Sequence, residues 1–151
     1  MELDEKKLER QYCASAYTID FENRKVLLMF NKKLNKWLQP GGHIEGKELP
    51  EETAIREAFE ETGVEIEVIG PNFGNGKYHP IAVERYINKV GDMIDIQFVA
   101  KPKEKIESDV ESLKNVENNK VIWMSLDELQ TNENVDDEIK IKVKTLYEMY
   151  K

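Results

Sequence analysis

The chain has 151 residues, and its 30 Asp and Glu against 22 Lys and Arg give a formal net charge of −8. This length suits one domain with its own core, so we expect residues 1–151 to form a single domain. Apolar residues make up 40% of the chain, which excludes a collagen-like or core-poor sequence, and the negative charge argues against binding to a nucleic-acid polymer or an anionic membrane.

Apolar and polar residues follow one another in patterns that predict a mixed sheet flanked by helices. In chain order, we expect strands at 12–19, 25–30, 37–39 (short), 65–69, 81–90, 93–100 and 121–124. Residues 81–90 and 93–100 flank Gly91-Asp92 and are expected to form a hairpin. Helices are predicted at 50–62, 125–130 (capped by Ser125) and 136–150, whereas the polar stretch 104–119 is expected to be a long loop.

Membrane insertion and secretion have no support in the sequence. The longest purely apolar run covers residues 26–30, whereas a bilayer-spanning helix needs about 20 apolar residues. The first residues are charged where a signal peptide needs an apolar stretch, so we expect a cytoplasmic protein, as a monomer or a homodimer. Cys13 is the only cysteine, which excludes an intrachain disulfide and argues against a Cys/His zinc site.

The predicted helix 50–62 carries an unusual group of carboxylates. Pro50 suits the first turn and Gly63 the stop, so the helix ends just after Glu57, Glu60 and Glu61. These glutamates share one face, and acidic groups near a helix C-terminus oppose the helix dipole. Mg²⁺ would resolve this conflict because it prefers oxygen ligands and completes its shell with water and phosphate.

The remaining helix positions suggest how this face is held. Ile55, Ala58, Phe59 and Thr62 fall on the side opposite the glutamates, and we expect that side to pack on the sheet. Arg56 lies beside Glu57 and is placed to bridge back to Glu48, where a planar guanidinium would fix both carboxylates. A lone acidic helix face is most often only a solvated surface. The full spacing of residues 42–63, however, arises by chance with a probability on the order of 10⁻⁵ to 10⁻⁶.

Residues 42–64 resemble the signature of the Nudix (MutT-like) hydrolases, Gly-x5-Glu-x7-Arg-Glu-U-x-Glu-Glu-x-Gly-U, where U is bulky or aliphatic. All fixed positions match, with Val64 at the last U and Ala58, smaller than usual, at the first. The segments 37–42 (Trp-Leu-Gln-Pro-Gly-Gly) and 123–129 (Trp-Met-Ser-Leu-Asp-Glu-Leu) are also similar to that family. The resemblance implies an α/β class protein, a Nudix-type α/β/α sandwich with a mixed β-sheet.

The resemblance also implies an activity, namely the Mg²⁺- or Mn²⁺-dependent attack of water on the diphosphate linkage of a nucleoside diphosphate derivative. Candidate substrates are nucleoside triphosphates, nucleotide sugars, ADP-ribose and dinucleoside polyphosphates. The implied metal ligands are Glu57, Glu61, Glu60 and the Gly41 carbonyl oxygen, with Arg56 and Glu48 as orienting residues. The alternative is a nucleotide-binding sensor that keeps the fold without turnover. An RNA-end hydrolase is disfavoured by the acidic balance and by the lack of an aromatic-interleaved basic patch.

Several residue roles stay open at the level of sequence. The general base is Glu57 or a later loop residue, with Glu117 ahead of Glu107 and Glu111. We expect Gly42 to contact the substrate, whereas Trp37 and His43 either contact it or serve packing. The basic residues between positions 24 and 36 either steer phosphate or form a solvated loop.

Overall fold

The computed structural model describes residues 9–87, 91–106, 112–116 and 119–151, with only the backbone described for 112–116 and 119. The strands are β1 (Arg10–Asp20), β2 (Lys25–Asn31), β3 (Lys36–Leu38), β4 (Gly41–His43), β5 (Ile66–Gly70), β6 (Ala82–Ile87), β7 (Asp92–Pro102), β8 (Ser112–Val116) and β9 (Asn119–Ser125). The helices are α1 (Pro50–Thr62), α2 (Leu126–Thr131) and α3 (Asp137–Tyr150).

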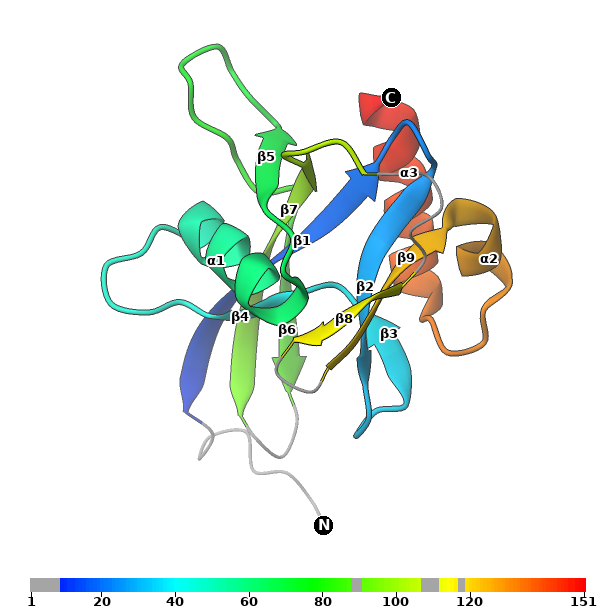
Figure 1. Ribbon diagram of the computed structural model, residues 1–151. Coiled ribbons are helices and arrows are strands. Elements are labelled where there is room, and N and C mark those ends of the chain that lie inside the picture. Colours follow the sequence, from blue (N-terminus) through cyan, green and yellow to red (C-terminus); the bar gives the residue numbers. More distant parts are fainter. Residues whose placement is uncertain (1–8, 88–90, 107–111, 117–118) are drawn as a thin grey trace.

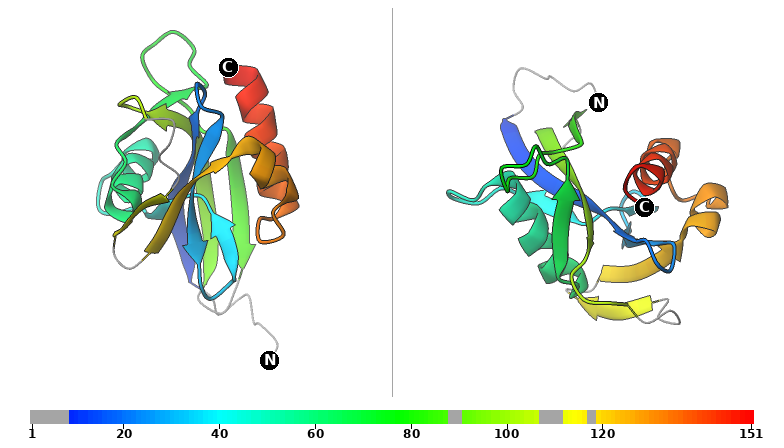
Figure 2. Two further views of the ribbon diagram at one scale, coloured as in Figure 1. Left: turned by 45° about the vertical axis from the view of Figure 1, so that its right-hand side comes forward. Right: turned by 90° about the horizontal axis from the view of Figure 1, so that it is seen from above.

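The sheet is mixed and has β1 near its centre. Its main path runs β5-β7-β1-β2-β9-β8, with β3 paired to β2, β4 to β1 and β6 to β7. β1 is parallel to β7 and antiparallel to β2 and β4. Helix α1 lies on one side of the sheet, and α2 and α3 lie on the other, as Figures 1 and 2 show. The expected α/β/α sandwich with a mixed sheet is therefore confirmed.

Alternation along β1 divides the interior into two clusters. Ala14 and Ala16 pack in the cluster under α1, whereas Tyr17 and Ile19 belong to the cluster that includes α3. Successive side chains of a strand point to opposite faces, so one strand supplies both cores. The strand predicted at 12–19 therefore packs against α1 on one face and against the layer that holds α3 on the other.

Helix α1 begins and ends as its sequence predicts. Pro50 occupies the first turn, and Gly63 ends the helix in the left-handed conformation with φ 76°, where its N–H donates to Phe59 O. The buried face, however, was predicted incorrectly in part. Ala58 and Thr62 are buried together with Thr53 and Ala54, but Ile55 and Phe59 are 37% and 51% exposed.

The small side chains of α1 explain this difference. Ala54 and Ala58 share a cluster with Ala14 and Ala16 of β1, so the helix approaches the strand closely. This contact turns the larger apolar residues of α1 away from the sheet. Helical periodicity fixes which residues share a face, but not which of two partly apolar faces is buried.

Two strands lie where the sequence predicted none. Residues 112–116, within the expected loop, form β8 and pair with β9, while residues 41–43 form β4 and pair with β1. The predicted hairpin of 81–90 and 93–100 is present as the antiparallel pair β6 and β7. Among the described residues, no helix is both long enough and apolar enough to cross a membrane.

Candidate active site

Arg56 holds the carboxylates of α1 and of the preceding loop together. Its Nε donates to Glu48 Oε2 at 2.6 Å and its Nη2 to Glu48 Oε1 at 3.0 Å. Its Nη1 donates to Glu57 Oε1 at 2.9 Å and to Glu60 Oε2 at 3.1 Å. The guanidinium therefore fixes three glutamates at once, which a lysine side chain lacks the fork geometry to do.

Glu48 is itself fixed by its surroundings. Its Oε1 also accepts from the Glu45 N–H and from Thr53 Oγ1, each at 3.0 Å. These bonds, the Arg56 bond first among them, lower the pKa of Glu48 to about 2. Glu48 therefore stays ionised at neutral pH and positions Arg56.

Strand β4 supplies the backbone against which the glutamates lie. The Gly41 N–H donates to Glu61 Oε1 at 2.9 Å. The neighbouring bonds from Ala16 N to Pro40 O and from Ile44 N to Tyr12 O make Ser15 and Gly41 a non-hydrogen-bonded pair of the ladder. In such a pair the N–H and the C=O both point away from the partner strand, so the Gly41 carbonyl oxygen lies on the Glu61 side of β4.

Gly42 lies directly against Glu57. A Cβ built on Gly42 would be 2.4 Å from Glu57 Cδ, so only glycine leaves room for this carboxylate. The Glu57 side chain is 16% exposed. Its burial raises its pKa, although the hydrogen bond and the charge of Arg56 work in the opposite direction. A nearby cation would stabilise the ionised form of such a half-buried carboxylate.

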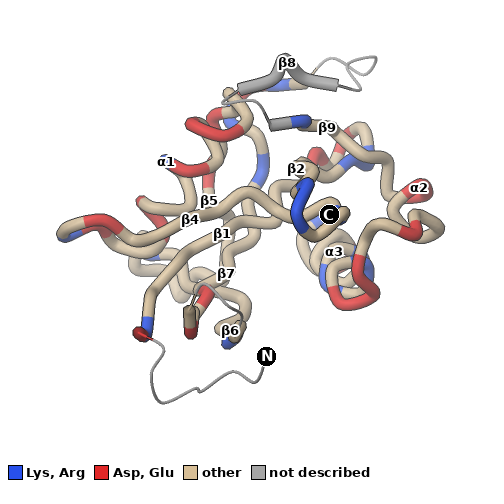
Figure 3. The backbone as a smooth tube through the Cα atoms, turned by 90° about the horizontal axis from the view of Figure 1, so that it is seen from below, with Lys and Arg blue, Asp and Glu red and all other residues tan. Residues whose placement is uncertain are grey.

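The other acidic side chains of α1 are not clustered closely. Within the described part of the chain, no three His, Cys, Asp or Glu side chains are grouped closely enough to hold a metal ion by themselves. Glu60 turns to Arg56 and is nearly half exposed. Figure 3 shows the acidic residues following one another along α1.

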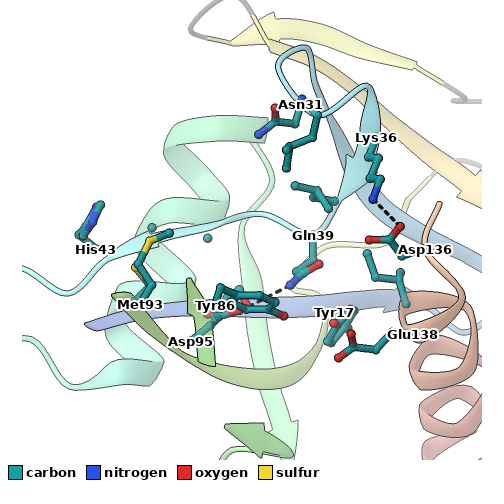
Figure 4. Close-up of a pocket in the computed structure, with 17 residues that line it drawn as sticks. Tyr17, Asn31, Lys36, Gln39, His43, Tyr86, Met93, Asp95, Asp136 and Glu138 are labelled. Carbon is teal, nitrogen blue, oxygen red and sulfur yellow. Dashed lines mark hydrogen bonds and ion pairs between the residues drawn. The ribbon is translucent and has the colours of Figure 1, made fainter. Parts of the chain in front are cut away.

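A cavity of about 550 Å³ lies beside the β4 glycines. Gly41 and Gly42 contribute to its lining together with Tyr17 of β1, Asp95 of β7 and Glu138 of α3. Figure 4 shows these elements around it, with the ion pair of Lys36 and Asp136 at one side. The same two glycines thus contact the glutamates and line the cavity.

The remaining predicted site residues lie in different places. His43 lines the cavity, and its carbonyl oxygen accepts from Arg56 Nη2 at 3.2 Å. Trp37 is a core residue that packs against Phe30, with ring centroids 5.1 Å apart, and it is not among the cavity-lining residues. The structure therefore shows the packing role, and a substrate contact of Trp37 stays a prediction. The base candidates Glu117, Glu107 and Glu111 lie outside the described residues.

A buried polar network in the cavity region lies outside the set of predicted site residues. Asp95 Oδ2 accepts from Ser15 Oγ at 2.9 Å and from Gln97 Nε2 at 3.1 Å. Lys142 Nζ donates to Gln97 Oε1 at 3.0 Å and also contacts Glu84. The available signal was the alternation of Asp95 and Gln97 with apolar residues in β7, which places two polar side chains on one buried face.

Comparison with known proteins identifies the family. A sequence profile of the NUDIX domain matches residues 9–144. A NUDIX-family hydrolase from Clostridium perfringens is 26% identical, with a TM-score of 0.75, over 95% of this chain and 100% of that chain.

Two further structures are similar at the level of the fold. An Ap4A hydrolase from C. elegans is 16% identical with a TM-score of 0.66, over 95% of this chain and 100% of that one. A MutT protein from Methanosarcina mazei Go1 is 19% identical with a TM-score of 0.65, over 95% and 96% of the two chains. The profile match, the fold and the fully matched signature lead to one conclusion: this chain belongs to the Nudix hydrolase family.

Proposed function

We propose that this protein uses Mg²⁺ or Mn²⁺ to hydrolyse the diphosphate linkage of a small nucleoside diphosphate derivative. The observation that carries this proposal is the position of Gly41 and Gly42 between two features. The Glu57 and Glu61 carboxylates lie against these glycines, and the 550 Å³ cavity is lined by them. A diphosphate over the glycines would face the carboxylates while its nucleoside entered the cavity.

The donor set suits a hard divalent cation. Glu57, Glu61 and the Gly41 carbonyl offer only oxygen atoms, and Mg²⁺ keeps water or phosphate oxygens in its remaining positions. This preference fits the described residues, among which no three acidic or histidine side chains are already grouped. We assign Glu57, Glu61 and the Gly41 carbonyl as the ligands, with Glu60 in a supporting place beside Arg56.

The chain's own residues then have distinct tasks. Arg56 and Glu48 hold the Glu57 carboxylate in place through the bonds described above. A divalent ion held there supplies positive charge to the phosphoryl oxygens and makes water more acidic. A carboxylate takes the proton from the attacking water, and Glu57, which Arg56 holds beside the glycines of β4, is the candidate within the signature. Glu117 remains the alternative base.

The cavity supports a small nucleotide but leaves the leaving group open. Its volume falls in the range of about 300–1,000 Å³ that is usual for small-molecule sites. Proteins of similar fold include an Ap4A hydrolase and a UDP-X diphosphatase, so the fold alone does not select among nucleotide derivatives.

A substrate panel tests the proposal directly. Purified protein is incubated with nucleoside triphosphates, nucleotide sugars, ADP-ribose and dinucleoside polyphosphates, with Mg²⁺, Mn²⁺ or a chelator, and the products are identified by chromatography. We expect cleavage within the diphosphate linkage that stops when the chelator is added. Tight binding of a nucleotide without any product would instead support the sensor alternative.

A further inference from the structure

Two residues that line the cavity each carry a buried acceptor oxygen without a hydrogen-bond partner among the described residues. These oxygens are Asp95 Oδ1 and Gln39 Oε1. Asp95 is only 7% exposed. A buried acceptor left unpaired loses the hydrogen bonds that water would have made, which costs folding free energy. Such an atom in a cavity wall points to a ligand that donates to it.

The Asp95 carboxylate is held in one orientation. Its other oxygen, Oδ2, accepts from both Ser15 Oγ and Gln97 Nε2. Gln97 cannot turn its amide freely because Lys142 Nζ donates to its Oε1. Oδ1 is therefore the oxygen left over for a ligand, and it stays in place before the ligand arrives.

Two hydroxyl donors near Asp95 are already engaged. Ser15 Oγ donates to Asp95, and the Tyr86 hydroxyl donates to Glu84 Oε2 at 2.8 Å. Gln39 uses its amide nitrogen on Ser15 Oγ at 3.4 Å, which leaves its carbonyl oxygen unpaired. Asp95 and Gln39 thus each keep one acceptor oxygen without a partner, and both residues bond to Ser15, as Figure 4 lets the reader follow.

We propose that Asp95, assisted by Gln39, recognises an exocyclic amino group of the nucleobase. This inference rests on the proposed function, since it assumes that the nucleoside enters the cavity. Amino-bearing bases donate N–H to Asp95 Oδ1, whereas the carbonyl groups of uracil, thymine and hypoxanthine place a lone pair against the carboxylate. The protein therefore prefers amino-bearing nucleotides.

The test compares nucleotides that differ in one amino group. GTP is paired with ITP, which lacks the 2-amino group, ATP with ITP, which has a carbonyl in place of the 6-amino group, and CTP with UTP, which has a carbonyl in place of the 4-amino group. We expect kcat/KM to favour the amino-bearing member of at least one pair by about 10-fold or more, as for sites built to bond a polar substrate group. Ratios near one in all three pairs would overturn the proposal, and this result needs no variant.

A variant then assigns the preference to Asp95. In Asp95→Asn the amide oxygen takes the bonds from Ser15 and Gln97, and the NH₂ group faces the cavity. The ratio in the discriminating pair should fall to one or below. The matched control, Asp127→Asn, makes the same chemical change at an exposed position of α2 and should keep the wild-type ratio. An unchanged ratio in Asp95→Asn would overturn the assignment.

Calorimetry separates this inference from the proposed function. Binding of α,β-methylene analogues of the same nucleotides, measured with Mg²⁺, does not require turnover. Amino-dependent binding of the analogues, with no hydrolysis of the corresponding natural nucleotides, supports the recognition by Asp95 and contradicts the enzymatic function. Hydrolysis with equal binding and equal rates within every pair supports the enzyme and contradicts the recognition. Absence of all nucleotide binding contradicts both.

Discussion

A single arginine organises the acidic residues of this site. Arg56 bonds Glu48 through two nitrogens and reaches Glu57 and Glu60 with a third. The positive charge offsets the repulsion between neighbouring glutamates, and the fork geometry fixes their direction. At the scale of residues, therefore, the site is preorganised on one side by Arg56 and on the other by the glycines of β4.

Removing either proposed metal-ligating carboxylate should abolish most activity. We expect Glu57→Gln and Glu61→Gln each to lower kcat by at least about 10²-fold, since each loses metal binding or proton transfer. Circular dichroism should show an unchanged fold. The control Glu67→Gln alters a half-exposed glutamate of β5 that pairs with Lys101 and should leave kcat unchanged. Full activity in either site variant would contradict the role of that residue.

The paired hydrogen bonds of the Arg56 guanidinium should contribute more to kcat than its positive charge alone. Arg56→Lys keeps the charge but loses the paired bonds to Glu48, so the Glu57 carboxylate is less well placed. We expect kcat to fall by about 10- to 100-fold, the scale of small misplacements of reacting groups. The same exchange at Arg24, which lies over the Tyr147 ring, should leave kcat near the wild-type value. Equal kcat values in the Arg56 and Arg24 variants would show that orientation by Arg56 is unimportant.

Among the elements, the short strand β4 connects the sheet with the acidic helix. It pairs with β1, with Gly41 opposite Ser15 and Gly42 opposite Ala14. The two glycines meet different neighbours. A Cβ on Gly41 would approach Ser15 Cβ at 2.5 Å and Ala14 O at 2.7 Å, whereas a Cβ on Gly42 would meet the end of the Glu57 side chain.

Substitutions at the two glycines should therefore have different effects. Gly41→Ala pushes against the β1 backbone, so we expect a loss of stability of about 1–3 kcal/mol, as for overpacked cores. Gly42→Ala displaces only the Glu57 carboxylate, so we expect a lower kcat with a nearly unchanged melting temperature. Thermal unfolding and steady-state kinetics on both variants check this. A Gly42→Ala protein with wild-type kcat would contradict the functional meaning of this contact.

Charge relates the site to the stability of the whole molecule. The chain has a net charge of −8, and half-buried Glu57 has a raised pKa because of its desolvation. Cation binding to the folded state raises stability by RT ln(1 + [L]/Kd), which is about 2.7 kcal/mol at 100 times Kd. For a domain of this size each kcal/mol corresponds to roughly 2–4 °C in melting temperature.

Magnesium should therefore stabilise the folded protein measurably. We expect saturating MgCl₂ to raise the melting temperature by about 5–10 °C, compared with NaCl at equal ionic strength. The rise should shrink in Glu57→Gln and should reverse when a chelator is added. A melting temperature that responds equally to both salts would contradict a specific cation site.

The buried Asp95 carboxyl gives stability a dependence on pH. Burial raises the pKa of Asp95 despite its bonds to Gln97 and Ser15. The folded state therefore binds this proton more tightly than the unfolded state. The resulting contribution to stability is present at low pH and is lost as pH rises from the unfolded pKa, about 3.9, through the folded pKa.

Asp95→Asn removes this titration. We expect the unfolding free energy of the variant, minus that of the wild type, to be larger at pH 7 than at pH 4. The reason is that at the higher pH the wild type bears a buried negative charge at Asp95 and the variant does not. Denaturant unfolding at both pH values measures the two differences in unfolding free energy. A difference that is the same at both pH values would show that Asp95 titrates alike in the folded and unfolded states.

The sequence by itself determined what depends on neighbours along the chain. The start and stop of α1 follow from Pro50 and Gly63. The contact of Arg56 with Glu48, which lies just before the helix, was expected from their short separation along the chain. The signature of residues 42–64 was enough to indicate the family, and the profile match confirmed it.

Only the tertiary structure decided what depends on packing between distant segments. The bond from Ser15 to Asp95 joins positions 80 residues apart, and the parallel register of β1 with β7 that creates it has no local signal. The same holds for the face of α1, where Ala54 and Ala58 are buried and Phe59 is exposed. Local periodicity offers several faces and registers, and the close packing of the whole core selects one of them.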